Sequence, residues 1–202
     1  MKFEIHIHST FSDGMNTIRE IISHAKSIGL DGISITDHDT IDELPLEEKI
    51  AREFNMKIIP GSEITTSIGH VLIYGLRKIP ITKNLSDFLD FVKKEGGISI
   101  LAHPYYSSFI SDFNGREELI KKFDAIEVIN GGLNYKQNLF AINLAKKYGM
   151  VGTGGSDAHF RGFIGRVMVE FDGDFIESVK ENKIKILSNN KEIKKLIKLW
   201  TS

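Results

Sequence analysis

The chain has 202 residues, of which 26 are basic and 27 acidic, giving a formal net charge of −1. This length suits one domain over residues 1–202 with its own core, and the balanced charge provides no overall positive field for a nucleic-acid backbone. Cysteine is absent, which excludes disulfides and thiolate sites, so a metal such as zinc, manganese or iron could be held only by imidazole and carboxylate groups. The sequence shows neither a signal peptide nor an apolar run of ~20 residues, so we expect a cytoplasmic protein with no membrane partner.

The first predicted element is a strand over residues 3–8, in which apolar and polar residues alternate. His6 and His8 stand two positions apart, so their side chains point to the same side of the strand and can meet one ion. A surface strand with two solvated histidines would show the same pattern. This stretch alone therefore leaves metal binding open.

A capping box at Thr17 and Glu20 predicts an amphipathic helix that ends near Gly29. His24 lies in this helix and is interpreted as a solvated or partly buried residue. The short apolar strand that follows, residues 32–36, runs directly into a polar segment.

In that polar segment, Asp39 and Thr40 suit the cap of a helix over residues 41–54, whereas His38 has no capping role. Strand 57–61 precedes Glu63, a carboxylate in an apolar and hydroxyl-rich stretch, where it would be costly unless paired or metal-bound. His70 begins the next strand, residues 69–74.

The remaining elements continue to alternate between strands and helices. His103 follows strand 98–102, and Asp157 and His159 stand two apart after a short strand over 150–153. The other predicted elements are helix 84–95, a loop over the site at 105–115, helix 116–123, strand 125–130, helix 134–148, strand 167–171, helix 174–182 and a C-terminal helical face formed by Ile193, Leu196, Ile197 and Trp200.

This alternation predicts an α/β domain with a parallel sheet, and about seven such units predict a closed or nearly closed barrel. In a parallel barrel the carboxyl ends of the strands meet on one face. Six of the seven histidines stand at strand ends or starts. With Asp13, Glu63 and Asp157 they make nine candidate ligands, which suits two or three divalent ions.

Five motifs resemble, in order and spacing, those of the PHP domain, the polymerase and histidinol phosphatase superfamily, over nearly the whole chain. They are His6-Ile7-His8-Ser9 with Ser12-Asp13-Gly14, Ile35-Thr36-Asp37-His38-Asp39, Gly61-Ser62-Glu63, Ala102-His103-Pro104 and Ser156-Asp157-Ala158-His159. The resemblance implies a distorted (β/α)7 barrel with a trinuclear site of manganese, zinc or iron at the C-terminal ends of the strands.

The resemblance also implies which residues hold each ion. The first ion would be held by His6, His8, Glu63 and Asp157. Glu63 would bridge to a second ion, completed by His70 and His103. The third would be held by Asp13, His38 and His159.

The chemistry implied is hydrolysis of a phosphate ester by a metal-bridging hydroxide. Glu63 and Asp157 would flank and orient the hydroxide, and His159 would act as a ligand or as a proton donor to the leaving oxygen. Arg161 and Asn130 are candidate substrate contacts, with a surface charge and a turn residue as equally good interpretations.

The expected substrate is a small nucleotide or another phosphorylated metabolite, or a short oligonucleotide. About two dozen residues separate His103 from Glu127, where many nucleotide-specific members carry an insertion, so a more open site is expected. A histidinol-phosphate phosphatase is the first alternative. An amidohydrolase-like carbon–nitrogen hydrolase and a non-catalytic PHP regulatory domain are the others, and the sequence leaves the oligomeric state open.

Overall fold

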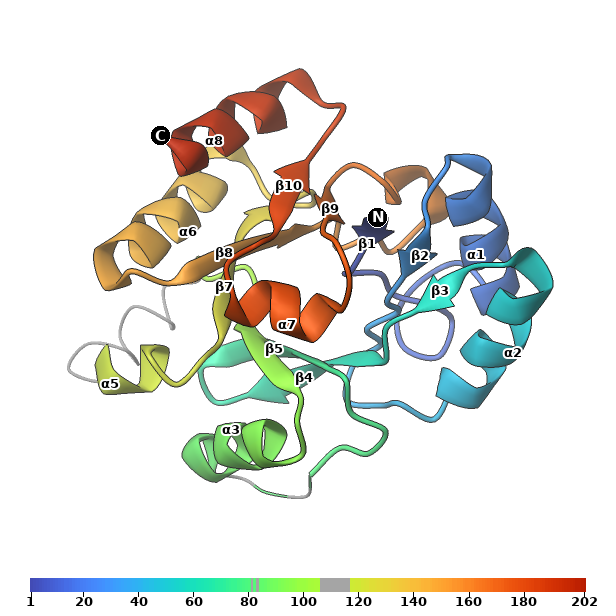
Figure 1. Ribbon diagram of the computed structural model, residues 1–202, viewed down its shortest axis with the longest axis horizontal. Helices are drawn as coiled ribbons and strands as arrows, with labels where there is room; N and C mark the ends of the chain where they lie inside the picture. Colours follow the sequence, from blue (N-terminus) through green and yellow to red (C-terminus); the bar gives the residue numbers. More distant parts are fainter. Residues whose placement is uncertain (81, 83, 106–116) are drawn as a thin grey trace.

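Two five-stranded sheets form the centre of the protein, with helices packed around them (Figure 1). The computed structural model describes residues 1–80, 82, 84–105 and 117–202. Most of the predicted loop over residues 105–115 therefore lies outside the described residues. The strands are β1 (Lys2–Glu4), β2 (Gly32–Ile33), β3 (Lys57–Ile58), β4 (Gly61–Thr66), β5 (Gly69–Tyr74), β6 (Ile98–Leu101), β7 (Ala125–Asn130), β8 (Val151–Gly155), β9 (Met168–Glu170) and β10 (Lys185–Leu187).

The first sheet has the order β10-β9-β1-β2-β3 and the second has the order β4-β5-β6-β7-β8. Neighbours β1, β2 and β3 are parallel, as are β6, β7 and β8. Strands β5 and β9 run antiparallel to both of their neighbours. The prediction of an α/β domain is thus confirmed, whereas the all-parallel sheet is wrong and the closed (β/α)7 barrel is not confirmed.

Strand β5 reverses direction because only two residues separate it from β4, too few for a crossover connection. The reversal places its first residues beside the end of β6, where the backbone N–H of Ala102 donates to the carbonyl of His70 at 3.1 Å. A histidine at the start of a strand therefore reaches the same edge of the sheet as histidines that follow strands.

Single-residue bridges connect the two sheets at this edge. Ile7, beyond β1, pairs with Ala158, beyond β8, and His38, beyond β2, pairs with Glu63 in β4. The residues that follow β1 and β2 therefore reach across to the second sheet.

The helices agree largely with the predicted periodicity. They are α1 (Ile18–Ser27), α2 (Leu44–Phe54), α3 (Leu85–Lys94), α5 (Glu117–Ile120), α6 (Tyr135–Tyr148), α7 (Phe175–Lys180) and α8 (Lys191–Thr201), with a 3₁₀ turn η1 (Arg161–Phe163). In Figure 1, α1 and α2 lie on one side of the strands and α6 and α8 on the other. No helix among these described segments has the length and apolarity needed to cross a membrane.

The capping predictions succeed at α1 and fail at α2. Thr17 and Glu20 form the reciprocal capping box of α1, with the Thr17 N–H donating to Glu20 Oε2 at 2.8 Å. At α2 the residue before the helix is Glu43, which makes no side-chain cap. Asp39 instead has a left-handed backbone, with φ of 55°, and accepts a hydrogen bond from the Thr65 N–H at 2.8 Å.

One of the apolar cores contains residues from both sheets. Phe3 and Ile5, in and just beyond β1, pack with Leu72 and Tyr74 of β5 and with Phe175 of α7. The Tyr74 hydroxyl donates to the Ile5 carbonyl at 2.7 Å, so this buried polar atom is satisfied. The packing holds the two sheets together beneath the edge where the bridges lie.

Candidate metal centre

The nine predicted ligands come together at the bridged edge, and we refer to them as the polar cluster. Its members are His6, His8, Asp13, His38, Glu63, His70, His103, Asp157 and His159. They come from β4, β5 and the segments that follow β1, β2, β6 and β8. Both sheets therefore contribute to one group of side chains.

Glu63 lies at the middle of the polar cluster and is almost completely buried, with 1% of its surface exposed. Five imidazoles approach its carboxylate. Two of them lie near Oε1, His70 Nδ1 at 3.1 Å and His103 Nε2 at 2.8 Å. Three lie near Oε2, His6 Nε2 and His8 Nε2 at 3.1 Å each and His38 Nδ1 at 3.6 Å. The two oxygens thus face two separate groups of imidazoles, as a bridging carboxylate would.

The donor atoms around Glu63 Oε2 have the spacing of ligands to a common ion. Two ligands that each lie about 2.1 Å from one ion are about 3.0 Å apart at a right angle and about 3.4 Å apart at a tetrahedral angle. Asp157 Oδ1 lies 3.5 Å from His6 Nε2 and 3.3 Å from His8 Nε2. These four residues are the set predicted for the first ion, and their donor atoms lie within 4.8 Å of one another.

The other two groups differ in part from the predicted sets. One contains His38, Glu63 and His70, and the other contains His8, Asp13, His38 and His159. His38 and His8 are therefore shared between groups, and His103 joins the second through its contact with Glu63 Oε1. Which residue binds which ion stays a prediction.

Several buried donor atoms of the polar cluster lack hydrogen bonds within the cluster, which a bound cation would compensate. Both ring nitrogens of His8 and the Nδ1 of His38 are buried and have no hydrogen-bond partner among the residues that the structure describes. Buried polar atoms normally have a partner, and unpaired ones are costly. Imidazole and carboxylate donors suit zinc, manganese or iron, so these residues fit the metal ions that the sequence predicts.

Burial and the surrounding charges shift the pKa values of the polar cluster. Burial alone would raise the pKa of Glu63, but His6 and the hydrogen bond from His103 outweigh it and hold the pKa well below its usual range. In Asp157, too, burial opposes the lowering of the pKa that His6 and His8 produce. Burial lowers the pKa of His6, but the carboxylates of Glu127 and Glu63 outweigh it and raise that pKa well above its usual value.

Two members of the polar cluster have an unusual backbone. His103 has φ of 27° and Asp157 has φ of 54°, both in the left-handed region that non-glycine residues rarely adopt. Gly155 allows the residues after β8 to come close to β1, because a Cβ atom there would lie 2.4 Å from the Cβ of His6. Such strain is typical of residues whose position serves a site.

Glu127 is the residue of the site that the sequence analysis missed. Its carboxylate is 1% exposed, Oε1 lies 2.8 Å from His6 Nδ1, and Oε2 accepts the backbone N–H of His103 at 3.0 Å. One feature of the sequence could have indicated it: Glu127 is a single acidic residue inside an apolar strand, where a buried carboxylate needs a partner.

Asp37, which belongs to one of the five motifs, is a hydrogen-bond acceptor for the loop after β1. The carboxylate accepts the backbone N–H of Ser9 at 2.7 Å and the hydroxyl of Ser12 at 2.5 Å. Asp37 therefore holds the loop that carries Asp13 towards the polar cluster.

The two predicted substrate contacts lie in different surroundings. Asn130 is fully buried, and its side-chain amide is used in hydrogen bonds with Glu127, Asp157 and Gly132. Arg161 lines a surface cavity of about 380 Å³ beside α1, together with His24. A contact between either residue and substrate stays a prediction.

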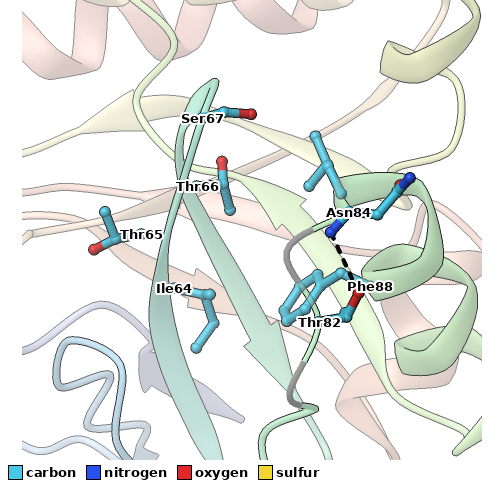
Figure 2. Close-up of a pocket in the computed structure, with 8 residues that line it drawn as sticks. Ile64, Thr65, Thr66, Ser67, Thr82, Asn84 and Phe88 are labelled. Atoms are coloured by element: carbon cyan, nitrogen blue, oxygen red, sulfur yellow. Dashed lines mark hydrogen bonds between the residues drawn. The ribbon is translucent and has the colours of Figure 1, made fainter.

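A second surface cavity lies behind the β4–β5 hairpin, and its volume is about 250 Å³. Figure 2 shows Ile64 and Thr66 on the side of the hairpin that faces Phe88 of α3, whereas Thr65 points away from it. Because side chains alternate along a strand, Glu63 lies on the same face of β4 as Thr65. This cavity is therefore on the opposite face of β4 from the polar cluster.

The chain is similar in sequence to several known proteins. Residues 136–184 match the sequence family described as PHP-associated. An uncharacterized protein of Methanocaldococcus jannaschii is 32% identical in an alignment of 143 residues that covers 64% of this chain and 82% of the relative. A probable histidinol-phosphatase of Thermotoga maritima is 28% identical over 205 residues, covering 83% of this chain and 88% of the relative. A 5'-3' exoribonuclease of Haemophilus influenzae is 36% identical over 66 residues, 33% of this chain and 24% of the relative.

Among solved structures, the chain is similar to a two-domain protein of Bacteroides vulgatus that contains a predicted PHP-like metal-dependent phosphoesterase. The TM-score is 0.75 at 22% sequence identity, over 98% of this chain and 69% of that protein. At this identity the likeness concerns the fold.

Proposed function

Because the chain belongs to the PHP family, we propose that it is a metal-dependent phosphoesterase that hydrolyses the phosphate ester of a small metabolite or nucleotide. The observation that carries the proposal is the carboxylate of Glu63, buried and approached by five imidazoles from both sheets. A group so rich in imidazole and carboxylate is suited to two or three divalent ions of manganese, zinc or iron.

Divalent ions bound there would polarise phosphoryl oxygens and lower the pKa of a water molecule. Glu63 and Asp157 would orient that water, because their carboxylates are ionised and lie at the buried centre of the polar cluster. His159 lies at the rim, with a side chain that is 38% exposed, and its Nε2 is 3.1 Å from Asp13 Oδ2. In this proposal His159 and Asp13 hold an ion at the side where substrate enters.

The pattern of exposure supports this direction of approach. His6 and His8 are at most 1% exposed, whereas the side chain of Asp13 is 54% exposed. In the sequence, Phe11 and Met15 lie two residues on either side of Asp13, and Phe160 directly follows His159. These three large apolar residues are 49%, 76% and 43% exposed. We infer that they form an apolar rim at the entrance, which would favour a substrate with a ring, such as a nucleobase or an imidazole.

We also propose that the bridges between the sheets close a distorted seven-stranded barrel. The segments beyond β1 and β2 pair with each other, since the Thr36 N–H donates to the Ile7 carbonyl at 2.7 Å. They pair with β4 through His38 and Glu63 and with the end of β8 through Ile7 and Ala158. These contacts support a ring of seven strands in the order β1, β2, β3 and β4 counted as one interrupted strand, β5, β6, β7 and β8.

Two substrate classes have support from the relatives. The probable histidinol-phosphatase aligns with most of this chain, which supports a phosphate monoester. The exoribonuclease aligns over a third of this chain, which supports short oligonucleotides to a smaller extent.

A substrate screen tests the proposed function. Purified protein loaded with manganese would be assayed on p-nitrophenyl phosphate, nucleoside 3',5'-bisphosphates, histidinol phosphate and short RNA, with bound metal measured in the same sample. We expect hydrolysis of at least one of these esters. Inactivity on all of them by metal-loaded protein would contradict the proposal, and protein that binds no metal would favour a regulatory domain.

A further inference from the structure

Strand β7 contains a bulge directly behind the polar cluster. Glu127 pairs with Thr153 and Ile129 pairs with Gly154, so Val128 is an extra residue in this strand. In a regular strand, two residues three positions apart point to opposite faces. The extra residue turns Asn130 to the same face as Glu127, and the Asn130 amide donates to Glu127 Oε2 at 3.0 Å.

The pair formed by Glu127 and Asn130 contacts three members of the polar cluster. Glu127 Oε1 lies 2.8 Å from His6 Nδ1, and Oε2 accepts the His103 N–H at 3.0 Å. The Asn130 amide nitrogen also donates to Asp157 Oδ2 at 3.2 Å. Both residues of the pair are buried, with exposed fractions of 1% and 0%, so water does not compete for these bonds.

Helix α6 holds the bulge in place. The side-chain oxygen of Asn138 accepts the backbone N–H of Asn130 at 2.7 Å, and its nitrogen donates to the Asn130 carbonyl at 3.1 Å. The Asn130 side-chain oxygen accepts the Gly132 N–H at 2.8 Å. This last bond determines the orientation of the amide, because it leaves the amide nitrogen facing the two carboxylates.

We propose that Glu127 and Asn130 are positioning residues, presented together by the β7 bulge, that orient His6, His103 and Asp157 for binding a divalent cation. The inference rests on the proposed metal centre. An acceptor at His6 Nδ1 keeps the proton on that nitrogen, so the lone pair of Nε2 points at the cation. The Asn130 amide donates to Asp157 Oδ2. The other carboxylate oxygen, Oδ1, which is the one nearest His6 and His8, would then be available to bind the cation.

Few other side chains can replace this pair. In Glu127→Gln, the new amide nitrogen would face either His6 Nδ1–H or the N–H groups of His103 and Asn130, and each choice sets donor against donor. Asn130→Ala removes the side-chain bonds to Glu127, Asp157 and the Gly132 N–H but leaves the backbone bonds to Asn138 in place, so this variant should fold.

The experiment is a calorimetric titration of metal-free protein with manganese. Loss of an outer-shell partner typically weakens metal affinity by about 10–100-fold, and we expect this for both Glu127→Gln and Asn130→Ala. The matched control is Asn134→Ala, which removes the side-chain cap of α6 at Lys136 and Gln137 without contacting a ligand. Its affinity should stay within about twofold of the wild type, since a purely structural weakening of α6 does not reorient the ligands.

A second readout is the tautomer of His6 in zinc-loaded protein, from ¹⁵N shifts of the imidazole. We expect the proton on Nδ1 in the wild type and a change in Glu127→Gln. Folded Glu127→Gln and Asn130→Ala proteins that bind manganese as tightly as the wild type would overturn the inference while leaving the metal centre intact. If Glu127→Gln does not fold, the manganese affinity of Asn130→Ala tests the inference by itself. A wild-type protein that binds no metal would overturn both the metal centre and the positioning role of Glu127 and Asn130.

Discussion

His38 and Glu63 are paired across a parallel bridge that joins the two sheets, and His38 Nδ1 lies 3.6 Å from Glu63 Oε2. Two backbone hydrogen bonds form this bridge. The Asp39 N–H donates to the Glu63 carbonyl at 3.0 Å, and the Glu63 N–H donates to the Asp37 carbonyl at 3.2 Å. The junction between the sheets and the centre of the polar cluster are therefore the same place.

Metal binding should consequently stabilise the whole fold. A ligand present at about 100 times its Kd adds about 2.7 kcal/mol to the free energy of unfolding. For a domain of this size we expect the melting temperature to rise by about 5–10 °C. Thermal unfolding with manganese, compared with a chelator-treated sample, measures the shift; equal melting temperatures would contradict a site built from both sheets.

Replacing Asp157 with asparagine should abolish turnover and leave the fold nearly intact. The change keeps the shape of the side chain but removes the charge of an oxygen that lies 3.3 Å from His8 Nε2. We expect kcat/KM to fall on the order of 100-fold or more, with an unchanged circular dichroism spectrum. Asp90→Asn, an exposed aspartate that pairs with Lys122, is the matched control and should retain activity; full activity in Asp157→Asn would place the reaction elsewhere.

Metal affinity should rise with pH. Burial lowers the pKa of His6, but Glu127 and Glu63 outweigh it and raise that pKa, which favours an additional proton on this imidazole in metal-free protein. A cation must displace that proton, which makes the affinity increase by up to about tenfold per pH unit for each proton displaced. Manganese titrations at several pH values measure the slope, and an affinity independent of pH would show that no imidazole proton is displaced.

Glu47 should make stability depend on pH. Burial, together with Glu43 and Asp37, raises the pKa of Glu47 well above its usual value. Within the described part of the chain, Glu47 Oε2 has no hydrogen-bond partner. A raised pKa means that folding favours the protonated form, so this stabilisation is complete below the unfolded pKa of about 4.5 and is lost as the pH rises through the folded pKa.

Glu47→Gln should therefore reduce the loss of stability on going from about pH 5 to about pH 8, by about 1 kcal/mol or more. Urea unfolding at the two pH values measures the difference. Glu118→Gln, at an exposed position, is the control and should keep the slope of the wild type. A Glu47→Gln variant with that same slope would show that Glu47 is ionised in the folded protein.

Phe160→Ala should raise KM for substrates that carry a ring. Phe160 is 43% exposed, and the centroid of its ring lies 4.5 Å from that of the Phe163 ring, which packs against it. Stacking on an aromatic side chain contributes about 1–2 kcal/mol, or roughly 5–30-fold in KM. KM for a nucleotide should rise, whereas KM for glycerol phosphate, which has no ring, should stay the same. The control is Leu199→Ala on α8, another exposed apolar residue, which should leave both KM values unchanged. Equal effects on both substrates would contradict a ring-binding role.

Local patterns in the sequence predicted the parts of the site that depend on short-range geometry. His6 and His8 are correctly placed together because side chains two apart on an extended segment share a side, and Thr17 with Glu20 forms a local hydrogen-bonded box. The direction of β5 was missed, although the two-residue connection after Thr66 would have indicated it. The cap predicted for α2 was wrong because Asp39 bonds instead to Thr65, which is distant in sequence.

By itself the sequence determined that imidazole and carboxylate groups would gather at one edge of an α/β domain, since strand periodicity and strand ends are local properties. Only the tertiary structure decided how they are held. Glu127 and Asn130 share a face because the pairing of β7 with β8 contains a bulge, and His38 meets Glu63 because two sheets join there. Pairing between strands depends on contacts between distant residues, and these form only when the whole chain has folded.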